Sequence, residues 1–485
     1  MVFSSHLFLF GFLPLALAAY FLAPWRLRHL VLTLASYLFY GWSNPAFVAL
    51  LFASTAIDYW AGLVQATDSW WPRGKPAAEL APGAPRSRRQ RAAVTFSIVS
   101  NLSILGFFKY FHFGLESWNA LVHALGADSA SLETALRVTL PLGVSFYTFQ
   151  SMSYSIDVYR GRAAAMRNFV DFACFVSMFP QLVAGPIIRF SEVADQLRER
   201  TLTLAKSARG VAFFAVGLAK KVLLANPCGK VADTVFDAAS STALDAWYGL
   251  AAYAFQIYFD FSGYSDMAIG LGLVLGFVLP KNFDSPYRSR SITEFWRRWH
   301  LSLSTWLRDY LYVPLGGNRR GTARTYVNLA LVMLLGGLWH GAAWNFVAWG
   351  GAHGALLAAE RAVGADRLWR FVPRPLRTAW TFLLVLLTWV PFRAPDFAAT
   401  GEIFRRLLAL DEPTGAASLL PGVIYSPYLV GTFAAAAAVV WLAPQSWEWT
   451  RRLGAGKAAV VLALLALVIV TLATQRFNPF IYFIF

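Results

Sequence analysis

Apolar runs of bilayer length recur along nearly the whole chain and constrain its fold more than any other feature. A transmembrane helix needs about twenty mostly apolar residues. Several runs are short, so we expect roughly eleven to thirteen spans, some of them broken or tilted. Only 14% of the 485 residues are charged, against about a quarter in a soluble domain. The chain is therefore predicted to be an all-α polytopic membrane protein. The candidate spans lie near residues 7–23, 29–43, 46–66, 92–111, 139–158, 210–226, 246–259, 265–279, 326–343, 345–360, 378–393, 428–443 and 457–474.

The strongly positive charge of the chain fits a membrane protein. Its formal net charge is +16. Cytoplasmic loops of membrane proteins collect Lys and Arg, and anionic lipids attract them. Because the sequence contains no nucleic-acid-binding motif, we expect membrane lipid and no nucleic acid as the partner of this charge.

The residues that hold metals and cofactors are sparse. The two cysteines, Cys174 and Cys228, lie in or beside apolar segments, which argues against a disulfide framework and excludes a cysteine metal cluster. The sequence has no H-E-x-x-H zinc motif and no phosphate-binding loop. We therefore expect no metal and no tightly bound cofactor.

Basic loops alternate with neutral or acidic ones. Residues 72–91 carry six basic residues and one acidic residue, and 160–168 carries three arginines, whereas 112–138 is mainly acidic. The positive-inside rule then places the first two loops in the cytoplasm and the N-terminus outside. The first apolar run lacks the basic start of a cleaved signal peptide, so we interpret it as an uncleaved span.

Residues 171–190 and 260–266 interrupt this regular pattern. Pro180 and Pro186 do not fit one straight helix, so 171–190 is predicted to be re-entrant, with its irregular backbone buried in protein or lining a chamber. Asp260 and Asp266 need a cavity or a partner at membrane depth. A helix break is expected between them, at Ser262–Gly263, and the glycines that follow favour close helix packing over a nucleotide-binding loop.

Residues 291–312 are predicted to form an amphipathic helix that lies in the membrane interface. Its aromatic and leucine side chains share one broad face, and Arg297 and Arg298 lie largely off that face. Ser291 and Glu294 resemble a capping box at its start. A basic, tryptophan-rich amphipathic helix is typical of the interface plane.

The arginines around this helix have two interpretations, and both remain open. They reflect membrane topology and lipid contact alone, or they also form a mouth that attracts a polyanionic donor such as a phosphate-bearing coenzyme. The set is Arg288, Arg290, Arg297, Arg298, Arg308, Arg319 and Arg320.

Two histidines are the main candidates for chemistry. His340 stands inside the apolar run LLGGLWHGAAW, where an ionisable residue is a functional-site hypothesis by default. A neutral imidazole can take a proton from a hydroxyl, because its ordinary pKa is near neutrality. The alternative is a histidine hydrogen-bonded within the bundle. His300, in WRRWH, could equally anchor a helix to headgroups, and His353 is expected to pack or to support the site.

These segments resemble a known family. The run NFDSPYRSRSITEFWRRWHLSLSTWLRDYLYVPLGGNRRG, followed by LLGGLWHG, resembles the membrane-bound O-acyltransferase (MBOAT) family. The segments PLGVSFYTFQSMSYSIDVYRG, FPQLVAGPIIRF and YFDFSGYSDMAIGLG are similar to its bacterial polysaccharide branch, which includes the membrane subunit of alginate O-acetylation. The resemblance covers most of residues 1–360 and recurs at FNPFIYF.

The resemblance implies a fold and an activity. It implies one integral-membrane acyltransferase domain over residues 1–485, a helical bundle with re-entrant and interfacial helices around a central funnel, and a catalytic centre within 260–354. It implies a multi-pass protein of the bacterial inner membrane. Acetyl groups would come from a cytoplasmic donor, acetyl-coenzyme A, and pass outward to a periplasmic acetyltransferase subunit that decorates an alginate-like exopolysaccharide.

The resemblance also implies roles for residues. His340 matches the catalytic histidine of the family and is expected to act as general base, and His300 matches the second family histidine and is expected to orient the donor. We expect His300 at the cytoplasmic rim and His340 deeper, at the two ends of one path. The residues expected to bind donor or shape the cavity are Asp260, Asp266, Arg297, Arg298, Trp299, Trp339 and Asn345.

Other activities are compatible with the same residues. The fold could serve D-alanyl transfer to teichoic acid, or acetylation of cellulose or peptidoglycan. An alternative from a different functional class is a transporter for an acyl group or a glycan, with His340 as a proton relay. The absence of an internal or inverted repeat argues against the transporter.

Overall fold

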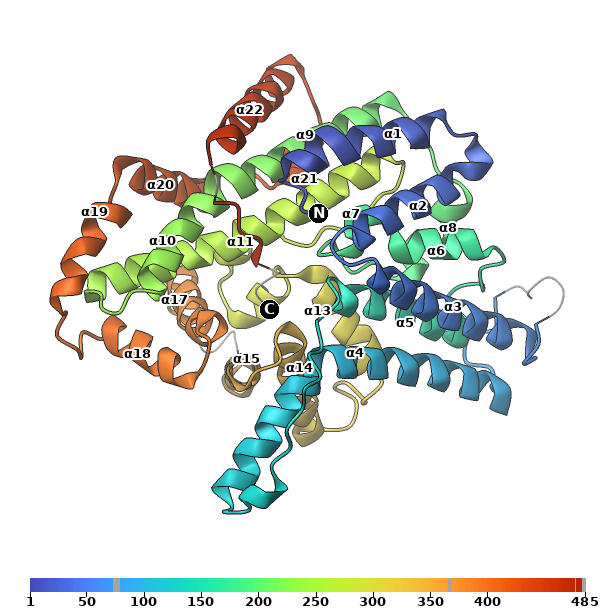
Figure 1. The fold of residues 1–485 in the computed structure, drawn as a ribbon, viewed down its shortest axis with the longest axis horizontal. Helices are drawn as coiled ribbons and strands as arrows, with labels where there is room; N and C mark the ends of the chain where they lie inside the picture. Colours follow the sequence, from blue (N-terminus) through green and yellow to red (C-terminus); the bar gives the residue numbers. More distant parts are fainter. Residues whose placement is uncertain (73–78, 365–368, 476, 482–485) are drawn as a thin grey trace. The chain divides into compact units, whose positions relative to one another are not determined.

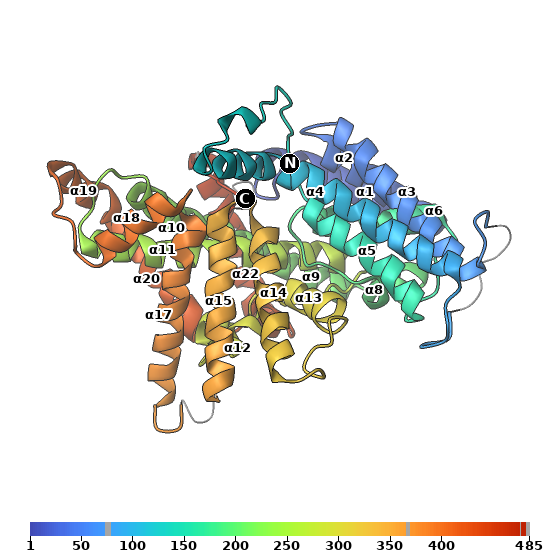
Figure 2. The ribbon, with the colours of Figure 1, turned by 90° about the horizontal axis from the view of Figure 1, so that it is seen from below.

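The computed structural model describes residues 1–72, 79–364, 369–475 and 477–481, and these residues form helices without any β-strand (Figures 1 and 2). The all-α prediction is confirmed. By its internal contacts the chain divides into two compact units. Unit 1 comprises Met1–Thr201 with Gly276–Leu279, and unit 2 comprises Leu202–Leu275 with Pro280–Phe485.

Unit 1 holds the N-terminal helices. A π-helical stretch at Leu7–Phe12 runs directly into the first α-helix. The helices are α1 (Leu13–Leu22), α2 (Arg28–Gly41), α3 (Ala46–Thr67), α4 (Arg88–Ala124), α5 (Val144–Arg160), α6 (Phe169–Ser177), α7 (Phe179–Leu182) and α8 (Phe190–Arg198).

Unit 2 holds the two candidate histidines. A π-helical stretch at Lys220–Ala225 joins its first two helices. The helices are α9 (Leu204–Ala219), α10 (Asn226–Phe236), α11 (Ala243–Val274), α12 (Ile292–Trp296), α13 (Leu301–Leu307), α14 (Thr322–His340), α15 (Trp344–Val363), α17 (Arg374–Arg393), α18 (Phe397–Leu407), α19 (Leu420–Ile424), α20 (Pro427–Leu442), α21 (Ser446–Trp449) and α22 (Ala455–Thr474).

Several helices have the length and apolarity of a membrane span. Five qualify within the described residues, and a sixth is counted if the pair Ala417–Ile424 and Pro427–Leu442, bent by 69°, forms one span. The other predicted spans coincide with helices that are shorter or less apolar. The qualifying five are Ala46–Thr67, Arg88–Ala124, Leu204–Phe236, Arg374–Arg393 and Ala455–Thr474. The chain is a multi-pass membrane protein.

The segment predicted to be re-entrant is a broken, buried stretch of unit 1. It consists of α6, α7 and an irregular connection before α8, and residues 172–188 are buried. Side chains bind the backbone groups that the breaks expose: Ser36 Oγ accepts from Phe179 N–H at 2.9 Å, and Gln181 Nε2 donates to Phe175 O at 2.8 Å. Irregular backbone at membrane depth needs such internal partners.

A buried carboxylate joins three helices of unit 1. Asp58 on α3 is fully buried. It accepts hydrogen bonds from Asn101 Nδ2 on α4 at 2.8 and 3.0 Å, and from the Ser97 and Ser151 hydroxyls. An intramembrane carboxylate persists only with such partners, so this network ties α3, α4 and α5 together.

In unit 2, α11 is one unbroken helix of 32 residues, so the predicted break at Ser262–Gly263 is wrong. The glycine serves packing instead. A Cβ atom on Gly263 would lie 2.7 Å from Gly217 O of α9, and one on Gly270 would lie 2.5 Å from Gly210 O. Small residues let helix backbones approach closely, and Figure 1 shows α9 and α11 side by side.

The prediction of one continuous helix over 291–312 is also wrong. The segment folds as α12, a turn, α13 and a π-helical stretch at Arg308–Tyr312. Its aromatic face is covered by protein, since Phe295 and Trp299 are buried. Ser291 Oγ caps α12 at Glu294 N–H, but the Glu294 carboxylate accepts from Arg290 N–H, so only half of the predicted capping box forms.

Close packing of α14 against α15 positions the end of α14. Gly337 and Gly350 face the opposing backbone so closely that a Cβ atom at either position would clash with it. Helix α17 packs on the other side of α15 (Figure 2).

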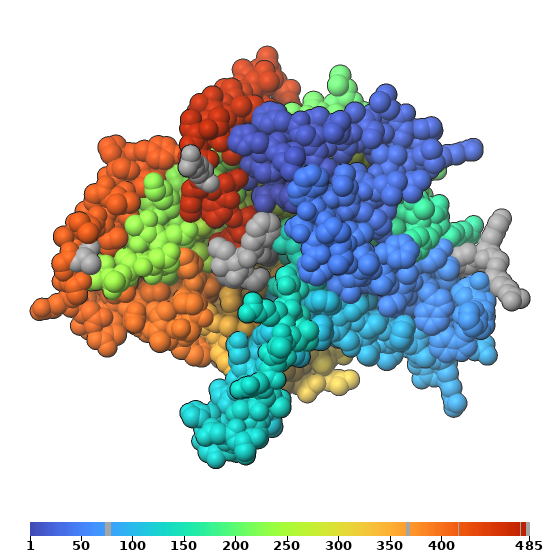
Figure 3. Space-filling view, viewed as in Figure 1, coloured from blue at the N-terminus to red at the C-terminus, as the bar shows by residue number. Residues whose placement is uncertain are grey.

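In the space-filling view, orange residues of the C-terminal part surround the green surface of α10 (Figure 3).

Candidate functional site

His340 is the last residue of α14 and is 8% exposed. The helix ends because Gly341 adopts extended backbone, with φ −153°. Aromatic rings surround the imidazole. The ring centroids of Trp339, Trp349 and Phe392 lie 5.0, 5.2 and 5.5 Å from that of His340. The environment of this histidine is therefore almost entirely apolar.

A small cavity of about 10 Å³ opens beside His340, with room for about one water molecule. Every lining residue except His340 is apolar, and all belong to unit 2. They are Ile257, Phe261, Trp299, His340, Trp349, Trp389, Phe392 and Ile481. A cavity of this character excludes bulk water.

His300 lies next to His340 and not at the other end of a path. The two imidazole centroids are 6.3 Å apart, and Trp339 contacts both rings, at 6.0 and 5.0 Å. His300 is fully buried. The predicted separation is wrong because the chain turns inward at Arg297–His300 and carries His300 into the core of the unit.

Asn282 fixes the conformation of His300. His300 has φ +43°, a left-handed conformation that costs a non-glycine residue about 1–2 kcal/mol. Asn282 supports the turn by accepting Leu301 N–H at its backbone oxygen, at 2.9 Å, and the Ser302 hydroxyl at Oδ1, at 2.9 Å. Backbone strain of this kind concentrates at functional sites.

The same asparagine sets the tautomer of His300. Nδ1 of the ring lies 3.1 Å from Asn282 Oδ1. An amide oxygen only accepts, so Nδ1 carries the proton and Nε2 carries the lone pair. His300 lies outside the candidate spans, and burial, followed by the nearby His340, lowers its pKa well below the ordinary value. The imidazole is therefore neutral at neutral pH.

The two aspartates pair with lysines. Asp260 lies 2.7 Å from Lys221 Nζ, with both side chains almost fully buried. Asp266 lies 2.7 Å from Lys220 Nζ and accepts from Ser446 Oγ at 2.6 Å. A buried charge needs such a partner. Neither aspartate lines the cavity, but Asp260 binds a residue that does, because its Oδ2 accepts at 2.7 Å from the N–H of Ile481.

The other predicted site residues divide into two groups. Trp299 lines the cavity, and Trp339 contacts both histidines. Asn345 instead donates to Ala394 O at 2.6 Å, Arg298 pairs with Glu294 at 2.8 Å, and Arg297 is exposed. The structure brings none of these last three to the cavity.

Several residues of the site were missed from the sequence. Ile481, Trp389 and Phe392 line the cavity, and Lys221 and Asn282 hold its surroundings. Two lysines inside an apolar run, at Lys220 and Lys221, were a usable signal, because intramembrane charges are rare and demand partners.

No group of three or more His, Cys, Asp or Glu side chains that could hold a metal occurs among the described residues. Cys174 and Cys228 are buried and form no disulfide.

Comparison with known proteins identifies the family to which this chain belongs. The model of the membrane-bound O-acyltransferase family (MBOAT) matches residues 162–389. A "Probable alginate O-acetylase AlgI" of Azotobacter vinelandii is 48% identical over 414 residues, covering 85% of this chain and 79% of the relative. One of Pseudomonas fluorescens is 42% identical over 538 aligned positions, covering all of both chains.

A relative with another acceptor in its name is also similar. A "Peptidoglycan O-acetyltransferase" of Helicobacter pylori is 37% identical over 446 residues, covering 85% of this chain and 80% of the relative. The matched residues include both histidines and every residue that lines the cavity except Phe392 and Ile481. The chain belongs to the membrane-bound O-acyltransferase family and is an O-acyltransferase.

Proposed function

We propose that this enzyme transfers acetyl groups from acetyl-coenzyme A, taken up on the cytoplasmic side of the bacterial inner membrane, for O-acetylation of an alginate-like exopolysaccharide. Support for the acceptor comes from the names of the two alginate O-acetylase relatives. The observation that carries the chemistry is the pair of imidazoles 6.3 Å apart, of which His340 lines an apolar cavity.

In this proposal His340 is the general base. The acceptor hydroxyl oxygen attacks the carbonyl carbon of the acetyl thioester. A C–O bond forms, the C–S bond breaks, and His340 takes the hydroxyl proton and returns it to the departing thiolate. Proton transfer of this kind contributes about 10²–10⁴-fold to a rate. The apolar cavity supports the assignment, since excluding water limits hydrolysis of the thioester.

His300 is proposed to orient the donor beside His340. Its Nδ1–H is engaged by Asn282, so Nε2 is the ring atom that carries the lone pair. Its neutral form avoids repulsion when His340 becomes an imidazolium. Asp260 is proposed to act indirectly, through the residues that it holds at the cavity.

We further propose that the acetyl group leaves on the outer side, to a periplasmic acetyltransferase subunit, and that the polysaccharide is the final acceptor. The excess of basic residues supports contact with anionic lipid on the cytoplasmic side. A second candidate acceptor is peptidoglycan, favoured by the Helicobacter pylori relative.

The test in cells is the acetyl content of the exported polymers. His340→Gln should abolish O-acetylation, while His123→Gln, a matched change of a histidine with an 82% exposed side chain, should leave it intact. The membrane level of each variant is measured by immunoblot. Alginate that stays acetylated in the His340→Gln strain would contradict the proposal, and loss of acetyl groups from peptidoglycan alone would favour the second acceptor.

A further inference from the structure

The segment Phe477–Ile481 lies against the core of unit 2, and its residues 477–480 have no regular secondary structure. Phe480 and Ile481 are only 4% and 2% exposed. The ring of Phe480 lies 4.9 Å from that of Tyr264 on α11. An irregular segment buried in this way needs partners for its backbone polar groups.

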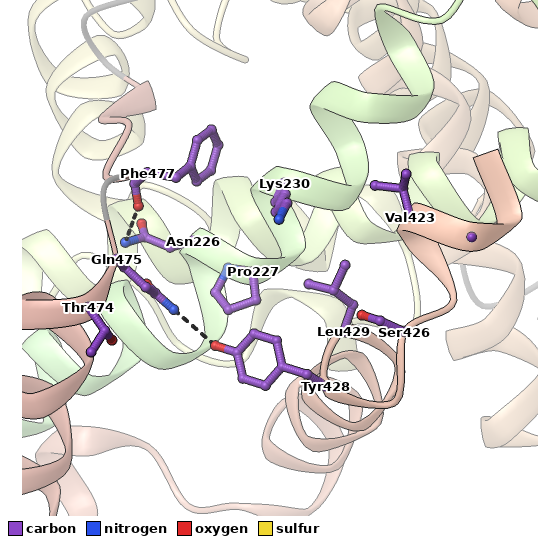
Figure 4. Close-up of a pocket in the computed structure, with 11 residues that line it drawn as sticks. Asn226, Pro227, Lys230, Val423, Ser426, Tyr428, Leu429, Thr474, Gln475 and Phe477 are labelled. Carbon is purple, nitrogen blue, oxygen red and sulfur yellow. Dashed lines mark hydrogen bonds between the residues drawn. The ribbon is translucent and has the colours of Figure 1, made fainter. Parts of the chain in front are cut away.

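Polar side chains from two helical regions supply those partners. Asn226 Nδ2 donates to Phe477 O at 3.4 Å, at the wall of a pocket of about 670 Å³ lined also by Lys230 and Tyr428 (Figure 4). Lys221 Nζ donates to Pro479 O, and Asp260 Oδ2 accepts Ile481 N–H at 2.7 Å.

The buried ion pair therefore holds the backbone of this segment in place. Lys221 and Asp260 bind each other and each binds the backbone of the segment, two residues apart. Their side chains are 3% and 1% exposed. Charges removed from water this completely hold their geometry tightly, since neither has an alternative partner in solvent. The position of Ile481 is thus fixed by groups outside the cavity.

Ile481 forms the wall of the His340 cavity that is easiest to change. Five of the other walls are Phe261, Trp299, Trp349, Trp389 and Phe392, whose rings contact each other or the two histidines. Ile257 sits within the buried helix α11. Ile481 is the aliphatic wall that lies outside α11, and it directly follows the irregular residues 477–480. Shortening its side chain therefore enlarges the cavity and leaves the aromatic cluster in place.

We propose that Ile481 sets the size of the acyl group that this enzyme transfers, and that Asp260 and Lys221 are positioning residues that hold it against the cavity. The inference rests on the proposed function. The apolar walls around the proposed catalytic base leave little space for a longer acyl chain. One methylene in an apolar pocket discriminates by about 10- to 200-fold.

The test compares acetyl-, propionyl- and butyryl-coenzyme A as donors for the purified full chain. Ile481→Ala should raise the ratio of kcat/KM for propionyl over acetyl transfer by about 10-fold or more, and Ile481→Val should raise it less. Phe480→Leu is the matched control, because this neighbouring ring faces Tyr264 and does not line the cavity; its ratio should not move.

The positioning role has its own readout. Asp260→Ala removes both the ion pair and the acceptor for Ile481 N–H. Like Ile481→Ala, it should raise the ratio of kcat/KM for propionyl over acetyl transfer. If total activity falls while this ratio stays constant, Asp260 contributes to the stability of the fold alone, and its proposed role in positioning Ile481 is overturned.

An unchanged ratio in both Ile481 variants, or an equal rise in Phe480→Leu, would overturn the role of Ile481. Ile481→Val is the mildest change and keeps the test decisive if Ile481→Ala does not fold. Failure of the unsubstituted enzyme to use any thioester is a different outcome, which would contradict the proposed donor and this inference together.

Discussion

The imidazole rings of His300 and His340 lie 6.3 Å apart, with Trp339 in contact with both. They are forty residues apart in the sequence, and two structural features bring them together. The turn before α13 carries His300 inward, and the tight α14–α15 crossing fixes the end of α14. Both features can be tested by substitutions that leave the two histidines unchanged.

Asn282→Ala should lower the transfer rate about 100-fold, because it removes the Oδ1 acceptor of the His300 ring and of the Ser302 N–H and hydroxyl, and small displacements of reacting groups cost about this much. The measurement is kcat and KM with acetyl-coenzyme A. Asn282→Asp keeps an acceptor at this position and should retain more activity than the alanine variant. Equal activities would show that the hydrogen bond to His300 does not position the ring.

Gly350→Ala should lower both thermal stability and activity, because its Cβ would clash with the backbone of α14. Gly351→Ala is the matched control one residue away. There the nearest atom is Leu334 Cδ2 at 3.5 Å, an ordinary contact, and alanine in a helix gains about 0.5–1 kcal/mol over glycine. Melting temperatures in detergent and initial rates check this. Tolerance of Gly350→Ala would mean that the two helices can separate without affecting the site.

Lys220→Met should destabilise the fold by about 3–5 kcal/mol, because it leaves the Asp266 carboxylate buried without its cation. The control is Lys281→Met, which breaks the more exposed pair with Asp284 and should cost less than about 1 kcal/mol. Thermal unfolding of both variants gives the comparison. Similar melting temperatures would contradict the buried character of the Lys220–Asp266 pair.

Acid should destabilise the folded enzyme partly through His300. Its pKa is lowered in the folded state by burial, whereas the unfolded chain takes up a proton near the ordinary pKa of 6.5. The stability that this group contributes is therefore fully present above pH 6.5 and is lost as pH falls below it, by up to about 1.4 kcal/mol per pH unit.

His300→Gln should accordingly flatten the decline in melting temperature between pH 7 and pH 5, relative to the unsubstituted enzyme. His123→Gln, at an exposed position, should leave the slope unchanged. A His300→Gln slope as steep as that of the unsubstituted enzyme would show that His300 takes up protons equally in both states.

The helices were largely predictable because apolar length is a local property of the sequence. The predicted spans 457–474 and 378–393 correspond to Ala455–Thr474 and Arg374–Arg393. The break expected at Ser262–Gly263 was wrong because glycine also serves close packing, and only the partner helix α9 distinguishes the two uses.

The assembly of the site was much less predictable. The position of His300 depends on a left-handed conformation that a non-glycine residue rarely adopts and on support from Asn282, 18 residues earlier. Ile481 reaches the cavity through a hydrogen bond to Asp260, 221 residues away in the chain. Local patterns of apolar and charged residues carry no record of such contacts.

The most direct test of the central claim is a rapid-mixing measurement of acetyl release from acetyl-coenzyme A by purified enzyme supplied with an acceptor. If His340 is the general base, His340→Gln should lower the single-turnover rate by about 10²–10⁴-fold while donor binding stays within a few-fold of that of the unsubstituted enzyme. A single-turnover rate that His340→Gln leaves unchanged would contradict the account.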